Sequence, residues 1–433
     1  MSVAMTIPAW LQKSGMDISF PHAPTWLNHY RQQQRDAFIE NGLPTRKNER
    51  WKYTDLSFLT NTNFSIAMRV DADRLLDAVH QHRLQHGASI LLVFVNGYFM
   101  PMLSDMAMLP QNVIACSMGD ALQNHTEKVQ ANWMHTIDAQ HYPFGSLNAA
   151  MFVDGLFFYV PDNIELTMPI HFLSLASGDN EFIAHPHHMI ILGRNSKMML
   201  VEEYFSWLEH AYMMNIVTTM VVLENATLNH CKIQHEGKQA VHMAHTFIYQ
   251  KQNSSVTFTN FSSGSLFARD EVVVKLQEFG ANCLTCGFYH LRYDNQYIDH
   301  HIDIDHAAPH SNSEMLYKGI IDKKSRAVFN GRLHVEKDAQ KILAYQANHN
   351  LLLSKDAEVY SKPELEIYAD DVKCKHGATT GQIDREALFY MRSRGIDRDD
   401  AMNILLQGFA EEVIKRITHL GVKMRVQEMM CRA

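Results

Sequence analysis

The chain has 433 residues, of which 46% are hydrophobic and 20% are charged. These values are typical of a globular protein, and they exclude a disordered chain, a collagen and a coiled coil. The 39 Lys and Arg residues and 47 Asp and Glu residues give a formal net charge of −8, so no general attraction to nucleic acid or to anionic lipid is expected. The six cysteines are too few for a disulfide framework, and the sequence suggests neither a signal peptide nor a membrane helix. We therefore expect a cytoplasmic protein with no nucleic-acid or membrane partner.

The N-terminal part of the chain is predicted to be helical. A segment from about residue 24 to residue 41 has apolar residues near helical spacing, and it is followed by a glycine and a proline that end helices. The aromatic and basic stretch RKNERWKYTDLSFL follows at residues 46–59, and residues 71–86 are a second helix candidate.

Between about residues 90 and 368 the pattern changes to short runs rich in Val, Ile, Phe, Tyr and Thr, separated by Gly, Asn, Asp or Ser. Helix-length apolar patterns are almost absent here, whereas alternating βα units would place a helix every few tens of residues. A single closed barrel would not use so many strands. Stacked sandwiches and a β-solenoid, in which each coil lays its strands on the previous coil, both remain open from the pattern alone.

The last fifty residues return to a helical pattern. Asp384 is suited to cap a helix that Gly395 closes, and Asp397 is suited to cap a second helix that we expect to end at Gly421. The apolar stripe of the second helix either packs on the rest of the protein or docks a partner. The predicted domains are an N-terminal helical domain, a β core and a C-terminal helical domain, at residues 1–89, 90–383 and 384–433.

The chain contains no phosphate-binding loop, dinucleotide-binding glycine motif or GxSxG nucleophile motif. The lone CxxC pair, Cys283 and Cys286, lies in a strand-like pattern that would point the two thiols to opposite faces, so ordinary buried cysteines are expected. A histidine-rich segment follows at residues 290–310, where an extended strand puts His301 and Asp303 on one face. With a distant histidine they could form the facial triad of an iron(II)-dependent enzyme. The alternative is a row of polar side chains on a sheet or at a subunit boundary.

The stretch 370–381 combines metal-ligating residue types. Cys374 and His376 are two residues apart in what we interpret as a Gly-containing connection after the last strand. A thiolate and an imidazole together suit iron, zinc or iron–sulfur species, and Lys373 and Lys375 would favour the thiolate. Because two ligands cannot close a tetrahedral site, any metal here would be transient or shared with another chain.

A family resemblance emerges from two stretches of the sequence. Residues 299–396, from DHHIDIDHAAPH through DDVKCKHGATTG to MRSRGI, resemble the core of the SufB/SufD family of iron–sulfur cluster assembly proteins. The motif RKNERWKYTDLSFL and the length near 430 resemble the SufD branch rather than the longer SufB branch. One departure is Lys375, where relatives usually carry a small residue.

The resemblance implies a mainly β protein whose core is a right-handed parallel β-helix, flanked by N- and C-terminal helical domains. It also implies a non-catalytic scaffold that pairs with SufB and shares a transient iron–sulfur cluster across the boundary, with no tightly bound cofactor in the isolated chain. A homodimer is the other possible pairing. By motif position the cluster histidine is His376, with Cys374 as its neighbour. The ATPase SufC would dock on the C-terminal helices, at Phe389, Arg392, Arg394, Gly395 and Phe409.

Overall fold

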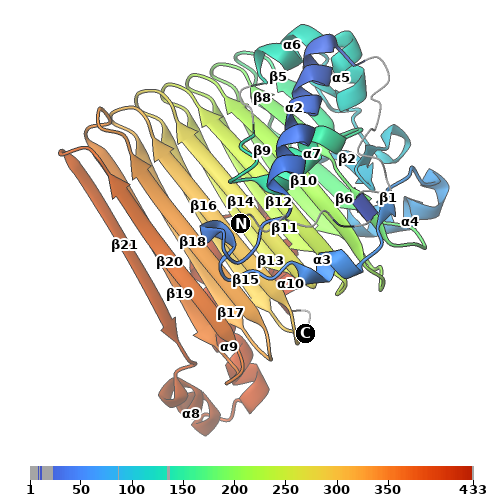
Figure 1. Ribbon diagram of the computed structural model, residues 1–433. Helices are drawn as coiled ribbons and strands as arrows, with labels where there is room; N and C mark the ends of the chain where they lie inside the picture. Colours follow the sequence, from blue (N-terminus) through green and yellow to red (C-terminus); the bar gives the residue numbers. More distant parts are fainter. Residues whose placement is uncertain (1–7, 9, 12–22, 86, 134–136, 432–433) are drawn as a thin grey trace.

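Two long β-sheets face each other through the middle of the chain, and helices lie at both ends of the sequence (Figure 1). The computed structural model describes residues 8, 10–11, 23–85, 87–133 and 137–431. The strands of the first sheet are β4 (Ile114–Ser117), β5 (Leu156–Val160), β8 (His187–Leu192), β10 (Tyr212–Val222), β12 (Ala240–Gln250), β14 (Phe267–Leu276), β16 (Tyr297–His306), β18 (Arg326–Val335) and β20 (Glu358–Ile367), with β1 (Ser65–Ile66) and β7 (Phe182–Ala184) beside them. The strands of the second sheet are β2 (Ile90–Val95), β3 (Tyr98–Phe99), β6 (Ile170–Leu175), β9 (Lys197–Phe205), β11 (Thr227–His235), β13 (Ser255–Ser263), β15 (Asn282–Leu291), β17 (Asn312–Ile321), β19 (Ile342–Leu352) and β21 (Val372–Gly381).

The helices lie mainly before β2 and after β21, with α5, α6 and α7 between β4 and β5. The α-helices are α2 (Thr25–Asn41), α3 (Ser57–Asn61), α4 (Leu76–His82), α5 (Met118–Asn124), α6 (Thr126–Ala131), α7 (Pro143–Met151), α8 (Arg385–Ser393), α9 (Arg398–Ile414) and α10 (Leu420–Cys431). The short 3-10 helices within the described residues are η1 (Glu49–Trp51), η2 (Ala72–Leu75) and η3 (Pro101–Leu103). Of the helices in the described ranges, none combines the length and the apolarity that a bilayer crossing requires.

The chain alternates between the two sheets, so that from β8 onward each strand pairs in parallel with the strand two places further along the sequence. This is a parallel β-solenoid. The prediction of a β-helix core with helices at both ends is confirmed, and stacked sandwiches are excluded. The division into three domains at residues 89 and 383 stays a prediction.

Asparagines at the turns link successive coils by side-chain hydrogen bonds. Asn163, Asn195 and Asn225 each have positive φ, a conformation that Asn tolerates better than most residues. The amide of Asn225 donates to the side-chain oxygen of Asn195, 30 residues earlier, at 3.0 Å, and Asn195 donates in turn to Asn163 at 2.9 Å. These two bonds tie three successive coils together at one corner.

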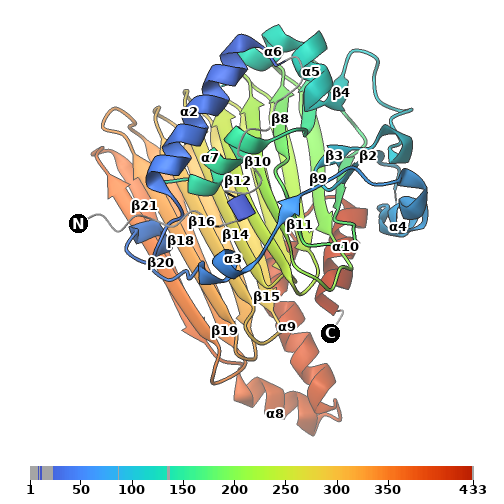
Figure 2. The same ribbon diagram turned by 45° about the vertical axis from the view of Figure 1, so that its right-hand side comes forward.

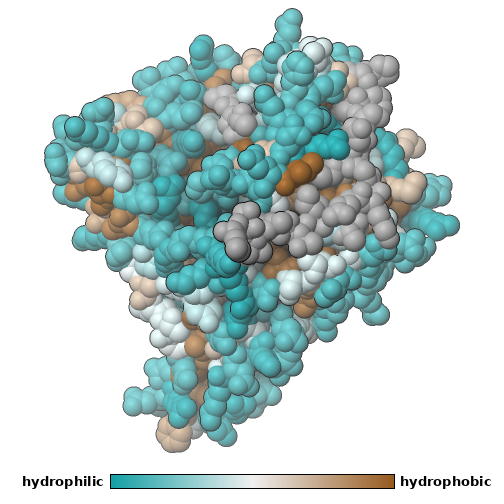
Figure 3. Space-filling model, viewed as in Figure 1, coloured by the Kyte–Doolittle hydropathy of each residue, from teal (hydrophilic) through white to brown (hydrophobic). Residues whose placement is uncertain are grey.

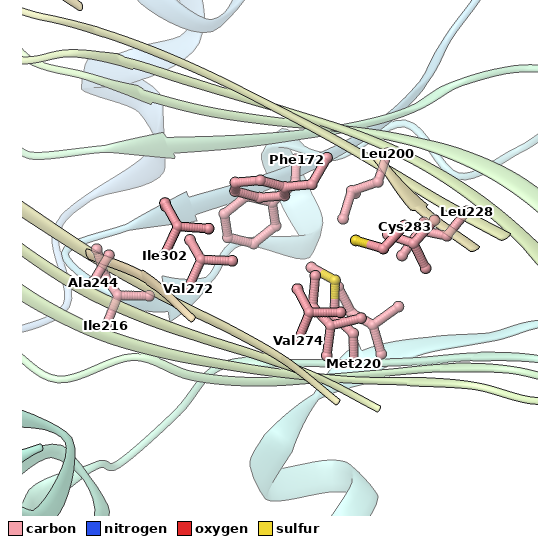
Figure 4. Packing of buried hydrophobic residues seen from close by; sticks show 14 of the residues in the cluster. Phe172, Leu200, Ile216, Met220, Leu228, Ala244, Val272, Val274, Cys283 and Ile302 are labelled. Atoms are coloured by element: carbon pink, nitrogen blue, oxygen red, sulfur yellow. The ribbon is translucent and has the colours of Figure 1, made fainter. Parts of the chain in front are cut away.

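Alternation along each strand separates an apolar interior from the outer faces. Figure 4 shows Phe172 and Leu200 on one side of the interior and Val274 on the other, with the thiol of Cys283 pointing in among them. Cys286 instead packs on the outer face, under the C-terminal helices. The prediction that the CxxC thiols point to opposite faces is confirmed.

The interior also holds buried charge. The interior charge cluster consists of Glu202, His230, Lys232, Glu236, His242 and Asp270, all at most 5% exposed. Lys232 donates to Asp270, and Nε2 of His230 lies 2.7 Å from Oε2 of Glu202. Burial alone would raise the pKa of Glu202, but His230 and Lys232, with a hydrogen bond from Tyr204, lower it to about 2. These groups are stable inside the protein because they neutralise one another.

Helices α2 and α7 lie on the outer face of the first sheet (Figure 2). The expectation that residues 90–368 are almost free of helices is wrong for α5, α6 and α7. Helices α5 and α6 have only 7 and 6 residues, too few to display a helical period. Every residue of α7 is buried, so it has no polar face that would reveal it as amphipathic.

The C-terminal helices pack on the outer face of the second sheet. Val413 of α9 and Val426 of α10 are fully buried there, together with Phe288 of β15. The prediction of one helix ending at Gly421 is wrong, because α9 ends at Ile414 and Gly421 lies inside α10. The helical segment breaks after α9, and α10 packs separately against the second sheet.

Candidate functional site

The solenoid ends in an open coil formed by β20 and β21. Strand β21 pairs with β19 and β20 pairs with β18, and within the described ranges neither has a neighbour on its other side. Both therefore present unpaired backbone groups, which are a template for another strand. Figure 1 shows them at the edge of the molecule furthest from α5 and α6.

Cys374 and His376 lie on β21, and their side chains lie on the same face of the sheet as those of the β19 residues that they pair with. Cys374 is in register with Ala344, and His376 is in register with Gln346. Ala344 and Gln346 are buried in the interior row of β19, so Cys374 and His376 continue that row at the open end. Cys374 is half-buried against the core, whereas His376 is exposed.

The interpretation of this stretch as a connection is wrong, since residues 372–381 form a full strand. Its sequence, VKCKHGATTG, has little strand propensity of its own. Strand β19 pairs with it residue by residue over its whole length, and this template overrides the local preference.

The expectation that Lys373 and Lys375 favour a thiolate is also wrong. As chain neighbours of Cys374 in a strand, both lie on the opposite face of the sheet. Burial raises the pKa of the Cys374 thiol, so this side chain is a thiol rather than a thiolate at neutral pH.

Polar side chains behind β21 brace the last coil across the interior, and sequence reasoning missed them. Gln346 donates to the carbonyl of Gly331 at 2.8 Å. Asn348 accepts from the Ser361 hydroxyl at 2.7 Å and donates to the Tyr289 hydroxyl at 3.1 Å. The signal was the alternation of Gln346, Asn348 and Asn350 within an otherwise apolar strand.

The predicted docking residues fall on two different environments. The Asp384 carboxylate accepts from the backbone N–H of Glu386 at 2.9 Å, which confirms it as the cap of α8. Phe389 is 74% exposed, and Arg392, Arg394 and Gly395 are also exposed on this projecting end. Figure 3 shows hydrophobic and hydrophilic residues next to one another at that tip.

Phe409 is different, because it is half-buried against the solenoid. Its ring centroid lies 4.6 Å from Nζ of Lys318 on β17. The structure therefore assigns Phe409 to the base of the helical unit and the other four positions to its exposed end.

The N-terminal motif at residues 46–59, here called the strap, crosses the outer face of the first sheet. Trp51 is 1% exposed, and the guanidinium of Arg269 lies 3.7 Å from its ring centroid. Arg50 donates to Asp303 at 2.9 Å. The motif therefore fastens the N-terminal segment to coils that lie more than 200 residues further along the chain.

The strap covers the residues assigned to iron in the alternative hypothesis. Asp303 is paired with Arg50 and also with Arg332, at 3.3 Å. Nε2 of His301 lies 3.0 Å from Oδ1 of Asp299. Over the described ranges, no group of three or more His, Cys, Asp or Glu residues is placed to hold a metal ion. The ion pairs thus occupy the groups that a facial triad would need.

Comparisons with known proteins cover almost the whole chain. The profile described as "SufBD protein N-terminal region" matches residues 11–172, and "SUF system FeS cluster assembly, SufBD core domain" matches residues 174–409. An iron–sulfur cluster assembly SufBD family protein of Synechocystis is 32% identical over 94% of this chain and 91% of its own length. SufD of Escherichia coli is 32% identical over 91% and 90%, and SufD of Bacillus subtilis is 22% identical over 92% of each chain. The chain therefore belongs to the SufBD family of iron–sulfur cluster assembly proteins and is a homologue of SufD.

Proposed function

We propose that this chain is the scaffold subunit of a complex of the SufB–SufC–SufD kind, and that its open coil pairs with a SufB solenoid. The observation that carries the proposal is the position of Cys374 and His376 in the interior row of an unpaired edge strand. Adjacent strands lie about 4.8 Å apart. A partner strand added beside β21 would therefore bring its own ligands within reach of this imidazole and this thiol.

The chemistry of the site suits a cluster that is cargo rather than a resident cofactor. This chain contributes two ligands, and the rest come from the partner, so the cluster exists only while the two solenoids are paired. In this proposal the chain is a scaffold and performs no catalysis of its own. Its stiff core fixes the distance between ligands from separate subunits.

The exposed end of the helical unit is the proposed docking site for the ATPase SufC. Phe389 and Tyr390 are 74% and 59% exposed there, beside the cationic Arg392 and Arg394. Aromatic and arginine side chains are those most enriched at binding hot spots. The sequence contains no phosphate-binding loop, so nucleotide hydrolysis in the complex would come from the partner.

The cluster role of His376 is tested by the His376→Ala variant in the reconstituted complex. We expect lower iron and acid-labile sulfide content after anaerobic assembly, with an unchanged subunit ratio. Lys375→Ala is the matched control, because Lys375 is also exposed on β21 but lies on its other face. Equal cluster content in both variants would contradict the proposed role.

The docking role is tested by Phe389→Asp rather than by deletion, because α9 and α10 are part of the solenoid's packing. We expect binding to SufC to weaken by at least tenfold in calorimetry. The control is Met102→Asp in η3, an equally accessible apolar side chain at 86% exposure. Retained affinity in Phe389→Asp would place the docking surface elsewhere.

The pairing itself is tested by sedimentation of the isolated chain and of an equimolar mixture with SufB. We expect the mixture to form the heterodimer at the expense of any homodimer. A homodimer that persists in the mixture would mean that the open coil pairs with a second copy of this chain.

A further inference from the structure

A row of three outward-facing side chains connects helix α9 to the edge strand β21. Lys318 of β17 is in register with His349 of β19, and His349 is in register with Thr379 of β21. Parallel register places these side chains side by side on one face of the sheet. The row ends three residues, or about 10 Å along the strand, from His376.

The first contact of the row is with α9. Nζ of Lys318 lies 2.6 Å from a carboxylate oxygen of Glu412, and it donates to the backbone carbonyl of Phe409 at 3.1 Å. The Lys318 side chain is only 9% exposed, so its ammonium depends on these partners rather than on water. Any displacement of α9 at Phe409 must therefore also displace Lys318, or break its contacts with the Phe409 carbonyl and with the half-exposed Glu412 carboxylate.

The second contact is with β21. Nδ1 of His349 lies 2.7 Å from the hydroxyl of Thr379. The pKa of His349 is lowered by burial and by Lys318, and raised by Glu412. His349 therefore interacts electrostatically with both ends of the first contact while it is hydrogen-bonded to the edge strand.

We propose that Lys318, His349 and Thr379 transmit movement of α9 to β21, with His349 as the positioning residue between the docking helices and the strand that carries His376. This inference rests on the proposed function for its biological meaning, because that function places the ATPase on the helices and the cluster on β21. The link itself is a property of this chain and is testable without a partner.

The test is a double-substitution cycle read by hydrogen exchange of β21 in the isolated full-length chain. Lys318→Met removes the contact with α9, and we expect the β21 amides to exchange about fivefold faster, the effect of one ordinary hydrogen bond. In the His349→Ala background Lys318→Met should add no further change. In the His349→Asn background, where the amide can occupy the position of Nδ1, Lys318→Met should again accelerate β21 exchange.

Glu314→Gln is the matched control. It breaks the ion pair in which Arg416, two residues beyond the end of α9, lies 2.6 Å from Glu314 of β17, but it leaves the row intact. We expect β21 exchange to stay unchanged in this variant. Equal acceleration in Glu314→Gln, or additive effects of Lys318→Met and His349→Ala, would overturn the proposal.

A second measurement separates this link from the proposed function. If SufC binds the native chain and changes the hydrogen exchange of β21, the His349→Ala variant should bind SufC with the same affinity but without this change in exchange. A change in β21 exchange that persists in His349→Ala would overturn the link. If SufC does not bind, the docking proposal fails, while the cycle in the isolated chain still decides the link.

Discussion

Replacing Asp270 with Asn tests whether the charge inside the solenoid is held there by its counter-ion. The side chains of Lys232 and Asp270 are 1% and 2% exposed, and they join β11 to β14 across the interior. The ring centroid of Tyr204 lies 5.5 Å from Nζ of Lys232. A cation–π contact of this kind is too weak to replace the carboxylate.

The expected destabilisation follows from the cost of removing a proton from Lys232. A lysine in the unfolded chain has a pKa near 10.4, about 3.4 units above pH 7, and each unit corresponds to about 1.4 kcal/mol. If the ammonium in Asp270→Asn loses its proton on folding, the free energy of unfolding falls by roughly 4–5 kcal/mol at pH 7. Breaking a buried pair by removing one partner typically costs about 3–5 kcal/mol, which agrees.

The pH dependence gives this prediction its sharpest test. In Asp270→Asn the unfolded chain would keep a proton that the folded chain has lost, so the unfolded chain binds more protons. Stability then rises with pH, and the deficit relative to the native chain shrinks by about 1.4 kcal/mol per unit from pH 7 towards pH 10. Lys232→Met should show the opposite slope, because Asp270 would take up a proton as the pH falls. The double variant should recover most of the stability.

Unfolding in urea, followed by circular dichroism at pH 7, 8 and 9, measures these differences. Glu165→Gln is the control, since its ion pair with Lys197 is about 60% exposed and should contribute less than about 1 kcal/mol at every pH. A deficit in Asp270→Asn that is equal at pH 7 and pH 9 would refute the reasoning. It would mean that Lys232 stays charged because Glu202 or Glu236 moves to replace Asp270.

Three other outcomes follow from the packing. Trp51→Ala should lower the free energy of unfolding by about 3–5 kcal/mol in urea titrations, because a fully buried indole is removed, whereas Lys47→Ala at the exposed start of the strap should not. Burial lowers the pKa of His188 and His300 to about 4. Because the unfolded chain takes up protons at these histidines before the folded chain does, the melting temperature should fall as the pH drops from about 6.5 towards 4. A melting temperature that does not change over this range would contradict the prediction. Because its thiol pKa is raised, Cys374 should react more slowly with iodoacetamide at pH 7.5 than a free cysteine does, as measured by mass spectrometry.

The positions of many strands could be predicted from short apolar and aromatic runs, whereas the choice of a β-helix over stacked sandwiches came from the family resemblance. The strand predicted at residues 342–353 is observed as β19 at Ile342–Leu352, one residue shorter. Strand β21 could not be predicted in this way, since its residues adopt strand geometry only on the template of β19. Helix α7 was missed for the opposite reason, because complete burial removes the polar face that marks a surface helix.

The candidate site could be predicted only where its reactive residues are close together in the sequence. Cys374 and His376 are conspicuous because metal-ligating residue types stand two positions apart. The row of Lys318, His349 and Thr379 is not visible, because its members are about 30 residues apart and meet only through the register of neighbouring strands. The strap could be recognised as a motif, but its structural role depends on partners more than 200 residues away.

The two edge strands of the open coil are held by unequal restraints. On the first sheet, Lys362 of β20 lies 2.8 Å from Glu49 of the strap, and Tyr360 stacks on Tyr53 with ring centroids 4.4 Å apart. On the second sheet, the side-chain tie that we find between β21 and its neighbour is the bond between His349 and Thr379. A force applied through α9 would therefore meet resistance from the strap at β20 and much less at β21. If the open coil pairs with a partner as proposed, movement there would concentrate on the strand that carries His376, and this proposed ligand would be exposed without unwinding the solenoid.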